Sequence, residues 1–275
     1  MKTGLKIASV AVAALLSAFV GVTPAAEAEQ PGSGGPQSRI IGGGDVSQGY
    51  SGAAASITSV DGPDQLFRCS GVLIAPHWVV TAAHCFNLIS VPPYGRTLVR
   101  IGTIDRSFGG ELREATGMYS QTGPADVGLL ELDKDVTSVP PAPIGPPVQA
   151  RDVPFPAVVT GWGRTCNPSR ADLDCLEPAR YLKYLNTNVI HPDLCTGEGR
   201  PIRPDIELCT ESKPTATPCE GDSGGPLSSL VQGRLVLIGV VSRGSDKEFC
   251  GSANTIMSDI TVSPTRNWIK GLTGA

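Results

Sequence analysis

Short apolar runs alternate with turn clusters along most of the chain after residue 40. The clusters are rich in Gly and Pro, as in Asp61-Gly62-Pro63 and Phe108-Gly109-Gly110. Short strands at this spacing, separated by such turns, predict an all-β fold, either a sandwich or barrels. The runs that predict strands are Gly71–Ile74, Val79–Thr81, Leu98–Ile101, Val127–Leu132, Val158–Gly161, Leu185–Ile190 and Leu235–Ser242.

Two segments depart from this strand pattern. Ser263-Pro264 supplies a helix N-cap and a first-turn proline, and Lys270-Gly271 supplies a stop, so a short C-terminal helix carrying Trp268 and Ile269 is predicted. The Pro-rich stretch 139–147 is the expected connector between two β halves.

The N-terminal residues are typical of an export signal. Lys2 and Lys6 precede an apolar run over 7–22, and Ala26-Glu27-Ala28 offers a small-residue cleavage site. The run is shorter than the roughly 20 residues that a membrane-spanning helix needs. We therefore expect 1–28 to be a removable signal peptide and the protein to be secreted, with no membrane partner. Residues 29–39 are polar and rich in Gly and Pro, so they should have no structure of their own.

Cysteine usage agrees with export. All eight cysteines follow the predicted signal, and in an oxidising compartment an even number indicates disulfides, although spacing alone does not fix the pairing. The alternative is a zinc site. The chain has no Cys-x-x-Cys and only three His, so a tetrahedral ligand set is not evident.

Composition narrows the classes of partner. The 22 Lys and Arg are outnumbered by 26 Asp and Glu, giving a net charge of -4, which argues against nucleic acid. The hydrophobic content of 40% is enough for a packed core, and 33 Gly with 24 Pro stay below the level of low-complexity chains.

One segment, Gly221-Asp222-Ser223-Gly224-Gly225-Pro226, suggests chemistry. A Ser among glycines can be an ordinary tight turn. It can also be a nucleophile whose neighbours lack side chains, so that a substrate carbonyl approaches closely and bare N–H groups bind the oxyanion. Both interpretations remain open from this segment alone.

A serine nucleophile needs a base, which His provides best near neutral pH. His84 follows the apolar run Trp78–Val80, whereas His77 and His191 adjoin prolines and are predicted at surface turns. The base in turn needs an acid to fix its tautomer. Asp126, just before an apolar strand, is either that acid or a solvated strand-end carboxylate.

Three blocks in this order, Thr81–Cys85, Asp126–Leu130 and Gly221–Pro226, resemble the chymotrypsin/trypsin family of secreted serine proteases. The resemblance covers 40–275 and is to a bacterial-type arrangement, with a signal and a short propeptide. It implies two six-stranded antiparallel β-barrels, about 40–145 and about 146–275, with the active site between them and a short C-terminal helix. The implied protein is a monomeric serine endopeptidase.

The resemblance also assigns catalytic roles. Ser223 would be the nucleophile, His84 the general base and Asp126 the carboxylate that orients it, with the N–H groups of Gly221 and Ser223 as the oxyanion hole.

Activation follows from the same resemblance. The segment Ile40–Gly43 is similar to the start of mature family enzymes, so 29–39 would be a propeptide removed by cleavage after Arg39. The freed ammonium of Ile40 would then pair with Asp222 and order the substrate pocket, which makes the intact chain a zymogen.

Three family disulfides map onto Cys69–Cys85, Cys195–Cys209 and Cys219–Cys250. We expect the two remaining cysteines, Cys166 and Cys175, to pair with each other.

The substrate-binding residues depart from the trypsin pattern. Thr217 stands where trypsins carry Asp, which favours uncharged residues before the cleaved bond, unless Asp259 lines the pocket and restores basic specificity. The resemblance makes Ser242, Arg243 and Gly244 the substrate-binding strand. Arg243 would favour acidic residues upstream, pair with Glu220 or stay solvated.

No cofactor or metal is expected, because Asp105, Glu111 and Glu114 form no convincing calcium pattern. The expected partners are protein or peptide substrates, with proteinaceous protease inhibitors as further candidates. A non-catalytic binding protein on the same fold is the rival hypothesis, but such relatives usually lack a triad residue. A purely structural disulfide-bonded protein would leave the three blocks unexplained.

Overall fold

Twelve strands build two β-barrels in the computed structural model, which describes Met1 and residues 40–275 with gaps at 48–51, 149–152, 167–176, 197–199 and 246–249. Six antiparallel strands close the first barrel in the order β2-β3-β4-β7-β6-β5, since β5 pairs back onto β2. Their bounds are Ala54–Asp61 (β2), Asp64–Ala75 (β3), Trp78–Thr81 (β4), Arg96–Ile101 (β5), Glu111–Ser120 (β6) and Gly128–Leu132 (β7).

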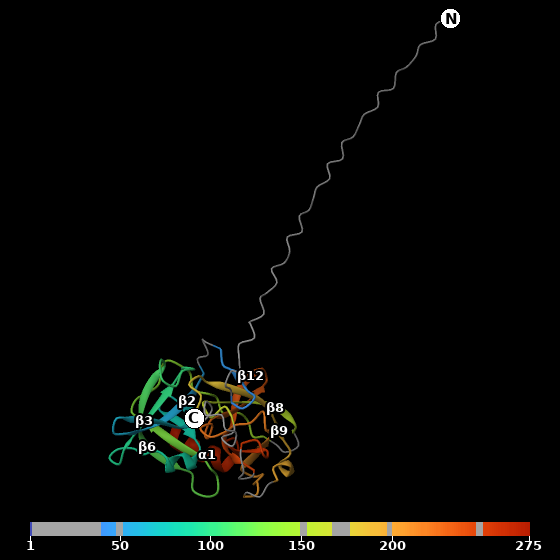
Figure 1. Cartoon of the computed structure of the whole chain (residues 1–275). Coiled ribbons are helices and arrows are strands. Elements are labelled where there is room, and N and C mark those ends of the chain that lie inside the picture. The colour runs from blue at the N-terminus through green and yellow to red at the C-terminus, as the bar shows by residue number, and fades with distance from the viewer. Residues whose placement is uncertain (2–39, 48–51, 149–152, 167–176, 197–199, 246–249) are drawn as a thin grey trace. The chain divides into compact units, whose positions relative to one another are not determined.

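The second barrel has the same construction, with its ring running β9-β10-β13-β12-β11-β8 and closed by pairing of β8 with β9. In Figure 1 its yellow-to-red strands lie beside the blue-to-green strands of the first barrel. The predicted pair of six-stranded antiparallel barrels is confirmed. The bounds are Phe155–Gly161 (β8), Lys183–Ile190 (β9), Glu207–Thr210 (β10), Pro226–Val231 (β11), Arg234–Gly244 (β12) and Thr255–Asp259 (β13).

The start of the domain packs on the second barrel. We placed the first barrel from about residue 40, but Gly44–Asp45 (β1) pairs with β9. Asp45 forms an ion pair with the buried Lys183, and the Val46 N–H donates to the Leu182 carbonyl at 3.2 Å. Backbone pairing and a buried charge together attach this segment to the second barrel.

The predicted C-terminal helix is present as α1, Ser263–Thr273, with Pro264 in its first turn, but the N-cap residue is Val262 and not Ser263, which is the first residue of the helix. It continues past Gly271 and ends at Gly274, which adopts a left-handed φ of 75° and donates its N–H to the Lys270 carbonyl. A left-handed C-terminal residue is the conformation that glycine accommodates without strain. Two short 3₁₀ helices, Ala83–Asn87 (η1) and Pro192–Leu194 (η4), complete the described elements used below.

Apolar side chains from both barrels pack together in one core cluster. The main core cluster combines first-barrel residues such as Val80 and Leu129 with Leu237 and Val240 of β12 and Ile269 of α1. Trp162, fully buried after β8, packs with Ala54 and Leu182 and donates its Nε1–H to the Ile104 carbonyl at 2.9 Å. This tryptophan therefore joins the second barrel to the first.

Replacing Trp162 with Phe should lower the free energy of unfolding by about 1–3 kcal/mol, because the Ile104 carbonyl keeps only the Leu182 N–H of its two donors and the smaller ring leaves a gap in the core. Denaturant titration followed by fluorescence and circular dichroism measures the change. Tyr94→Phe, at a side chain that is 91% exposed, is the matched control and should be neutral. Equal stability of Trp162→Phe and wild type would show that the link between barrels contributes nothing.

Candidate active site

Strand pairing in the first barrel brings His84 and Asp126 together. Thr81, at the end of β4, lies opposite Gly128, at the start of β7. His84 follows the first of these by three residues on η1, and Asp126 precedes the second by two. Asp126 accepts two hydrogen bonds from His84, from Nδ1 to Oδ2 at 2.8 Å and from the backbone N–H to Oδ1 at 2.9 Å. The carboxylate thus fixes both the ring and the backbone of the histidine.

The second barrel completes the environment of Asp126. Ser242 donates its hydroxyl to Oδ2 at 2.7 Å, and Ser258 donates to the Asp126 carbonyl at 2.9 Å. Burial raises the pKa of this carboxyl, but the hydrogen bonds and charge of His84 and the bond from Ser242 outweigh it, so the pKa is lowered below its ordinary value. Asp126 is therefore ionised near neutral pH, and His84 Nδ1 carries the proton.

Ser223 lies on a turn that packs against the strand leading to His84. Its carbonyl accepts from the Ser70 N–H at 2.9 Å, and the N–H of Gly224 donates to Val241 at 2.8 Å. Gly224 has a φ of 77°, and a Cβ there would overlap Thr81 Oγ1 and the Ser70 carbonyl. Only glycine permits this approach, which places the serine turn directly beside β3 and β4.

Two backbone N–H groups beside Ser223 have no acceptor among the described residues, those of Gly221 and of Ser223 itself. The Glu220 carbonyl accepts from the Arg164 N–H at 2.8 Å. Because a trans peptide points its C=O and N–H in opposite directions, the Gly221 N–H faces away from Arg164. Ser70 Oγ holds the next peptide by donating to the Gly221 carbonyl at 2.9 Å. This pair of N–H groups can bind an oxygen that carries developing negative charge.

A cavity of about 260 Å³ opens next to Ser223 and contains the predicted substrate-binding residues Thr217, Ser242, Arg243 and Gly244. Thr217 is buried and donates its hydroxyl to the Pro218 carbonyl at 3.1 Å. Among the described lining residues the one acid is Glu220, which forms an ion pair with Arg164 at 2.6 Å.

Asp259 lies outside this cavity, so the alternative that it lines the pocket is wrong. On β13 it lies opposite Gly239, whereas Thr255, four residues earlier, lies opposite Gly244 and does line the cavity. The Asp259 carboxyl accepts from Thr261 Oγ1 at 2.6 Å and from the Thr261 N–H at 2.7 Å. Burial raises its pKa despite these bonds.

Arg243 binds an acid that the sequence did not indicate. Its Nη1 and Nη2 donate to the two carboxylate oxygens of Glu207 at 2.7 and 3.1 Å. Arg200 also donates to Glu207, at 2.6 Å, and the side chain of Glu207 is fully buried. Arg243 is therefore neither paired with Glu220 nor left solvated. Glu207 lies on β10 and Arg243 on β12, so no local sequence pattern indicates this ion pair.

Asp222 is a second buried acid, and it differs from Asp126 in its partners. Its oxygens accept from the N–H groups of Gly163 at 2.8 Å and of Cys219 at 2.9 Å. No cation among the described residues pairs with it, and burial raises its pKa to about 7 in spite of these bonds. Ile40 is fully buried, and the Ile41 carbonyl accepts from the Thr217 N–H at 2.9 Å. Arg39 lies outside the described residues.

Three disulfides have the predicted pairing: Cys69–Cys85, Cys195–Cys209 and Cys219–Cys250. Cys166 is also disulfide-bonded, and Cys175, its expected partner, lies outside the described residues.

Among the described residues, one group of three potential metal ligands comes together. Cys69, His84 and Cys85 come together, but the two sulfurs are bonded to each other and offer no thiolate. The three acids considered for calcium are each paired with an arginine: Asp105 with Arg180, Glu111 with Arg113 and Glu114 with Arg96.

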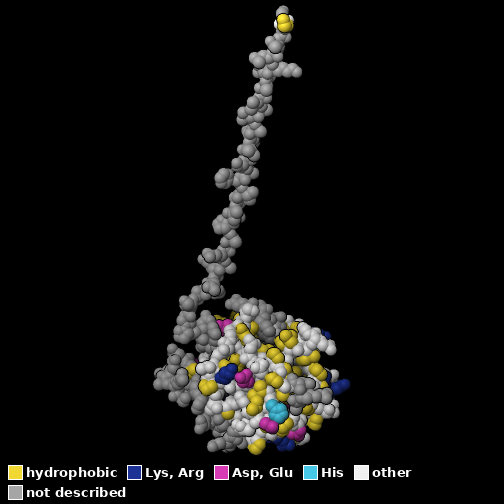
Figure 2. All heavy atoms as spheres, turned by 90° about the vertical axis from the view of Figure 1, so that its right-hand side faces the viewer, with side chains coloured by type: hydrophobic (Ala, Val, Ile, Leu, Met, Phe, Trp, Pro, Cys, Tyr) yellow, Lys and Arg dark blue, Asp and Glu magenta, His cyan; other side chains and the backbone are white. Residues whose placement is uncertain are grey.

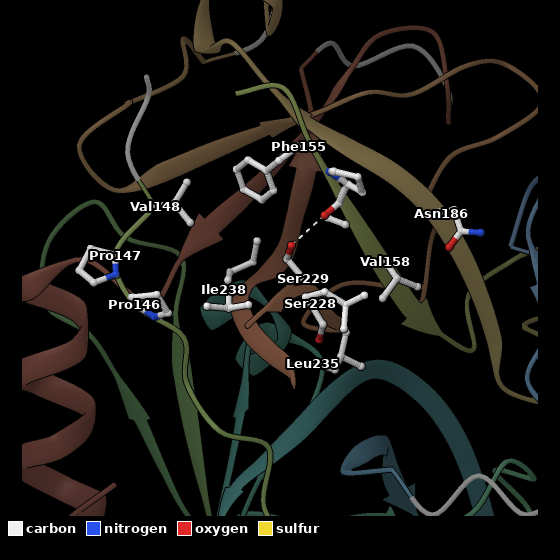
Figure 3. A pocket seen from close by; sticks show the side chains of 14 residues that line it. Pro146, Pro147, Val148, Phe155, Val158, Asn186, Ser228, Ser229, Leu235 and Ile238 are labelled. Atoms are coloured by element: carbon white, nitrogen blue, oxygen red, sulfur yellow. Dashed lines mark hydrogen bonds between the residues drawn. The ribbon is translucent and has the colours of Figure 1, made fainter. Parts of the chain in front are cut away.

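A larger cavity of about 530 Å³ lies on the second barrel, away from His84 and Ser223. Figure 3 shows its apolar lining, including Val148, Phe155 and Ile238. Ser229 is turned toward its neighbouring strand, where its hydroxyl donates to the Pro156 carbonyl at 2.8 Å. The described lining residues therefore offer packing surface and include no titratable side chain.

On the face shown in Figure 2, the Lys and Arg side chains outside the grey residues are few and scattered, and some lie directly beside an acidic side chain. Within the part of the chain that the structure describes, no helix has the length and apolar character needed to cross a membrane.

Two antiparallel barrels with His84, Asp126 and a cavity beside Ser223 define a chymotrypsin-like protein. The family model described as Trypsin matches residues 40–269, so the chain belongs to the trypsin family. Membership implies a serine endopeptidase, a hydrolase that acts on protein substrates. The family and the disulfides together favour an extracellular protein.

Proposed function

We propose that this protein is a secreted serine endopeptidase with Ser223 as nucleophile, His84 as general base and Asp126 as the orienting carboxylate. The observation that carries the proposal is the double hydrogen bond from His84 to Asp126, together with the backbone N–H groups of Gly221 and Ser223, which have no acceptor among the described residues. Its substrates are proteins or peptides, and proteinaceous inhibitors would occupy the same cleft. It acts as a monomer without a metal or other cofactor.

In the proposed reaction, Ser223 Oγ attacks the carbonyl carbon of the substrate while its proton passes to His84 Nε2. Asp126 keeps the Nδ1 proton in place and stabilises the imidazolium that forms. The N–H groups of Gly221 and Ser223 bind the oxyanion. The tetrahedral intermediate collapses, the amine leaves with the proton from His84, and an ester to Ser223 remains. Water, deprotonated by His84, then attacks the ester and releases the acid.

Two variants test the catalytic assignment. Ser223→Ala should abolish labelling by a fluorophosphonate, and Asp126→Asn should lower kcat by about 10⁴-fold because the histidine loses its correct tautomer. Labelling and peptide hydrolysis are measured on protein that begins at Ile40. His191→Gln, at an exposed histidine outside the site, is the control and should keep full activity. A wild type that is correctly processed but unlabelled would favour a non-catalytic binding protein.

We further propose that the residue before the cleaved bond is uncharged. The supporting observation is that Thr217 is neutral and that Glu220, the one described acid of the cavity, is neutralised by Arg164. A substrate Lys or Arg would bury its charge without a counter-charge, which is costly.

Peptides that differ only in that residue decide the point. Ala, Leu or Phe should give kcat/KM at least about tenfold above Lys, and Thr217→Asp should shift the ratio toward Lys. A Lys or Arg preference in the wild type would refute neutral specificity, whatever the result for the variant.

We also propose that cleavage after Arg39 activates the enzyme. The hydrogen bond from the Thr217 N–H to the Ile41 carbonyl ties the start of the proposed mature domain to the pocket. Asp222 directly precedes Ser223 in the sequence. The buried carboxyl lacks a cation, and the new ammonium of Ile40 would supply one.

The uncleaved protein should show the cost of this missing cation. The pKa of Asp222 is raised from 3.8 to about 7, so its contribution to stability is present at acid pH and is lost as the pH rises through about 7. Arg39→Gln should be secreted, inactive and less stable at pH 8 than at pH 5. Adding Asp222→Asn should flatten that part of the pH profile in urea titrations. Full activity of Arg39→Gln would sink the zymogen proposal.

A further inference from the structure

A second hollow, of about 300 Å³, is also lined by Ser223 but is distinct from the Thr217 cavity. The two hollows share Ser223 and Glu220 and otherwise have different walls. If the residue before the cleaved bond occupies the Thr217 cavity, the residues after that bond, here called the leaving side, enter the second hollow. Its walls combine apolar Phe67, Leu88 and Pro178 with charged Arg68, Arg164 and Glu220.

Arg68 is directed into this hollow by an irregularity in β3. Ile57 pairs with Cys69, and the next residue of β2, Thr58, pairs with Phe67, so Arg68 is the extra residue of a β-bulge. A bulge breaks the alternation of a strand and re-aims the side chain of its extra residue. Arg68 Nε donates to Ser59 Oγ at 2.8 Å, which fixes the orientation of the guanidinium.

The charges of the hollow do not cancel. Arg164 and Glu220 neutralise each other at 2.6 Å, whereas Arg68 has no acidic partner among the described residues. Its bond to Ser59 uses only Nε, which leaves Nη1 and Nη2 as donors.

Arg106 adds positive charge behind the wall. Its guanidinium lies 5.2 Å from the centre of the Phe67 ring, and it donates to the carbonyls of Ala179 and Pro178. Asp105 and Glu177 act on Arg106, but neither lines the hollow. Among the described lining residues Arg68 is thus the cation without an acidic partner, and a guanidinium with two free N–H edges matches a carboxylate.

We propose that Arg68 makes this enzyme select substrates with a carboxylate on the leaving side, one or two residues after the cleaved bond. The carboxylate belongs to an Asp or Glu side chain whose methylene groups contact Phe67, Leu88 and Pro178. The terminal carboxylate of a short peptide has the same chemistry, so the test separates the two sources. The inference rests on the proposed peptidase function.

The experiment compares internally quenched peptides that are identical up to the cleaved bond and carry Glu, Gln or Lys at the first or second position after it. All have amidated C-termini. We expect kcat/KM to be about tenfold higher for Glu than for Gln at one of these positions, and lowest for Lys. A Gln peptide that ends two residues after the bond with a free carboxylate shows whether a terminus substitutes for the side chain.

The variants Arg68→Gln and Arg68→Lys complete the design. Arg68→Gln should equalise the Glu and Gln peptides, while Arg68→Lys should keep a reduced preference because the charge remains. Arg96→Gln, which removes a cation paired with Glu114 on β5 and β6, is the control and should behave like wild type. Equal rates for Glu and Gln in the wild type, or a Glu preference that survives in Arg68→Gln, would overturn the inference.

A separate measurement keeps this result distinct from the proposed function. Fluorophosphonate labelling and hydrolysis of a chromogenic anilide, which has no residues on the leaving side, report the catalytic machinery without the leaving-side contacts of Arg68. If both are normal and the Glu preference is missing, only the role of Arg68 fails. If both are absent from processed protein, the peptidase proposal itself fails.

Discussion

The close packing of the turn 221–225 against strands β3 and β4 is the constraint on which the rest of the site depends. At Gly224 any side chain would overlap Thr81 and the backbone of Ser70. Thr81 Oγ1 in turn donates to the Ser70 carbonyl at 2.8 Å, so the two strands are held together where the turn meets them. Because β4 leads directly into η1, this single contact relates Ser223 to His84 across the two barrels. The precision of the site follows from backbone packing more than from any side chain.

Three carboxylates that are largely removed from solvent have different partners, which give them different behaviour. Asp126 receives hydrogen bonds from His84 and Ser242 and stays ionised. Asp222 receives only backbone N–H groups, and its pKa is raised to about 7. Glu207 is bound by the guanidinium groups of Arg200 and Arg243. A carboxylate buried without a cation is costly, so the partner that each finds determines how readily it ionises.

Much of the fold could be predicted from the chain, because strand length, turn composition and helix signals are local. The short apolar runs and the Ser263-Pro264 helix start correspond to observed strands and to α1. The residues that form the cleft were also identifiable, since the segments around His84, Asp126 and Ser223 carry unusual local sequence. The end of α1 was less predictable, because Gly271 is tolerated inside the helix while Gly274 supplies the left-handed residue.

The sequence by itself determined an all-β fold, and its resemblance to a known family predicted the two barrels, three of the disulfides and the three residues proposed for catalysis. Only the tertiary structure decided how the charges around them are paired. Arg243 binds Glu207 rather than Glu220, and Asp259 lies outside the pocket. A bulge in β3 directs Arg68 into the hollow that Ser223 also lines. The physical reason is that strand register and bulges bring together residues far apart in sequence. A shift of one residue reverses the direction of a side chain.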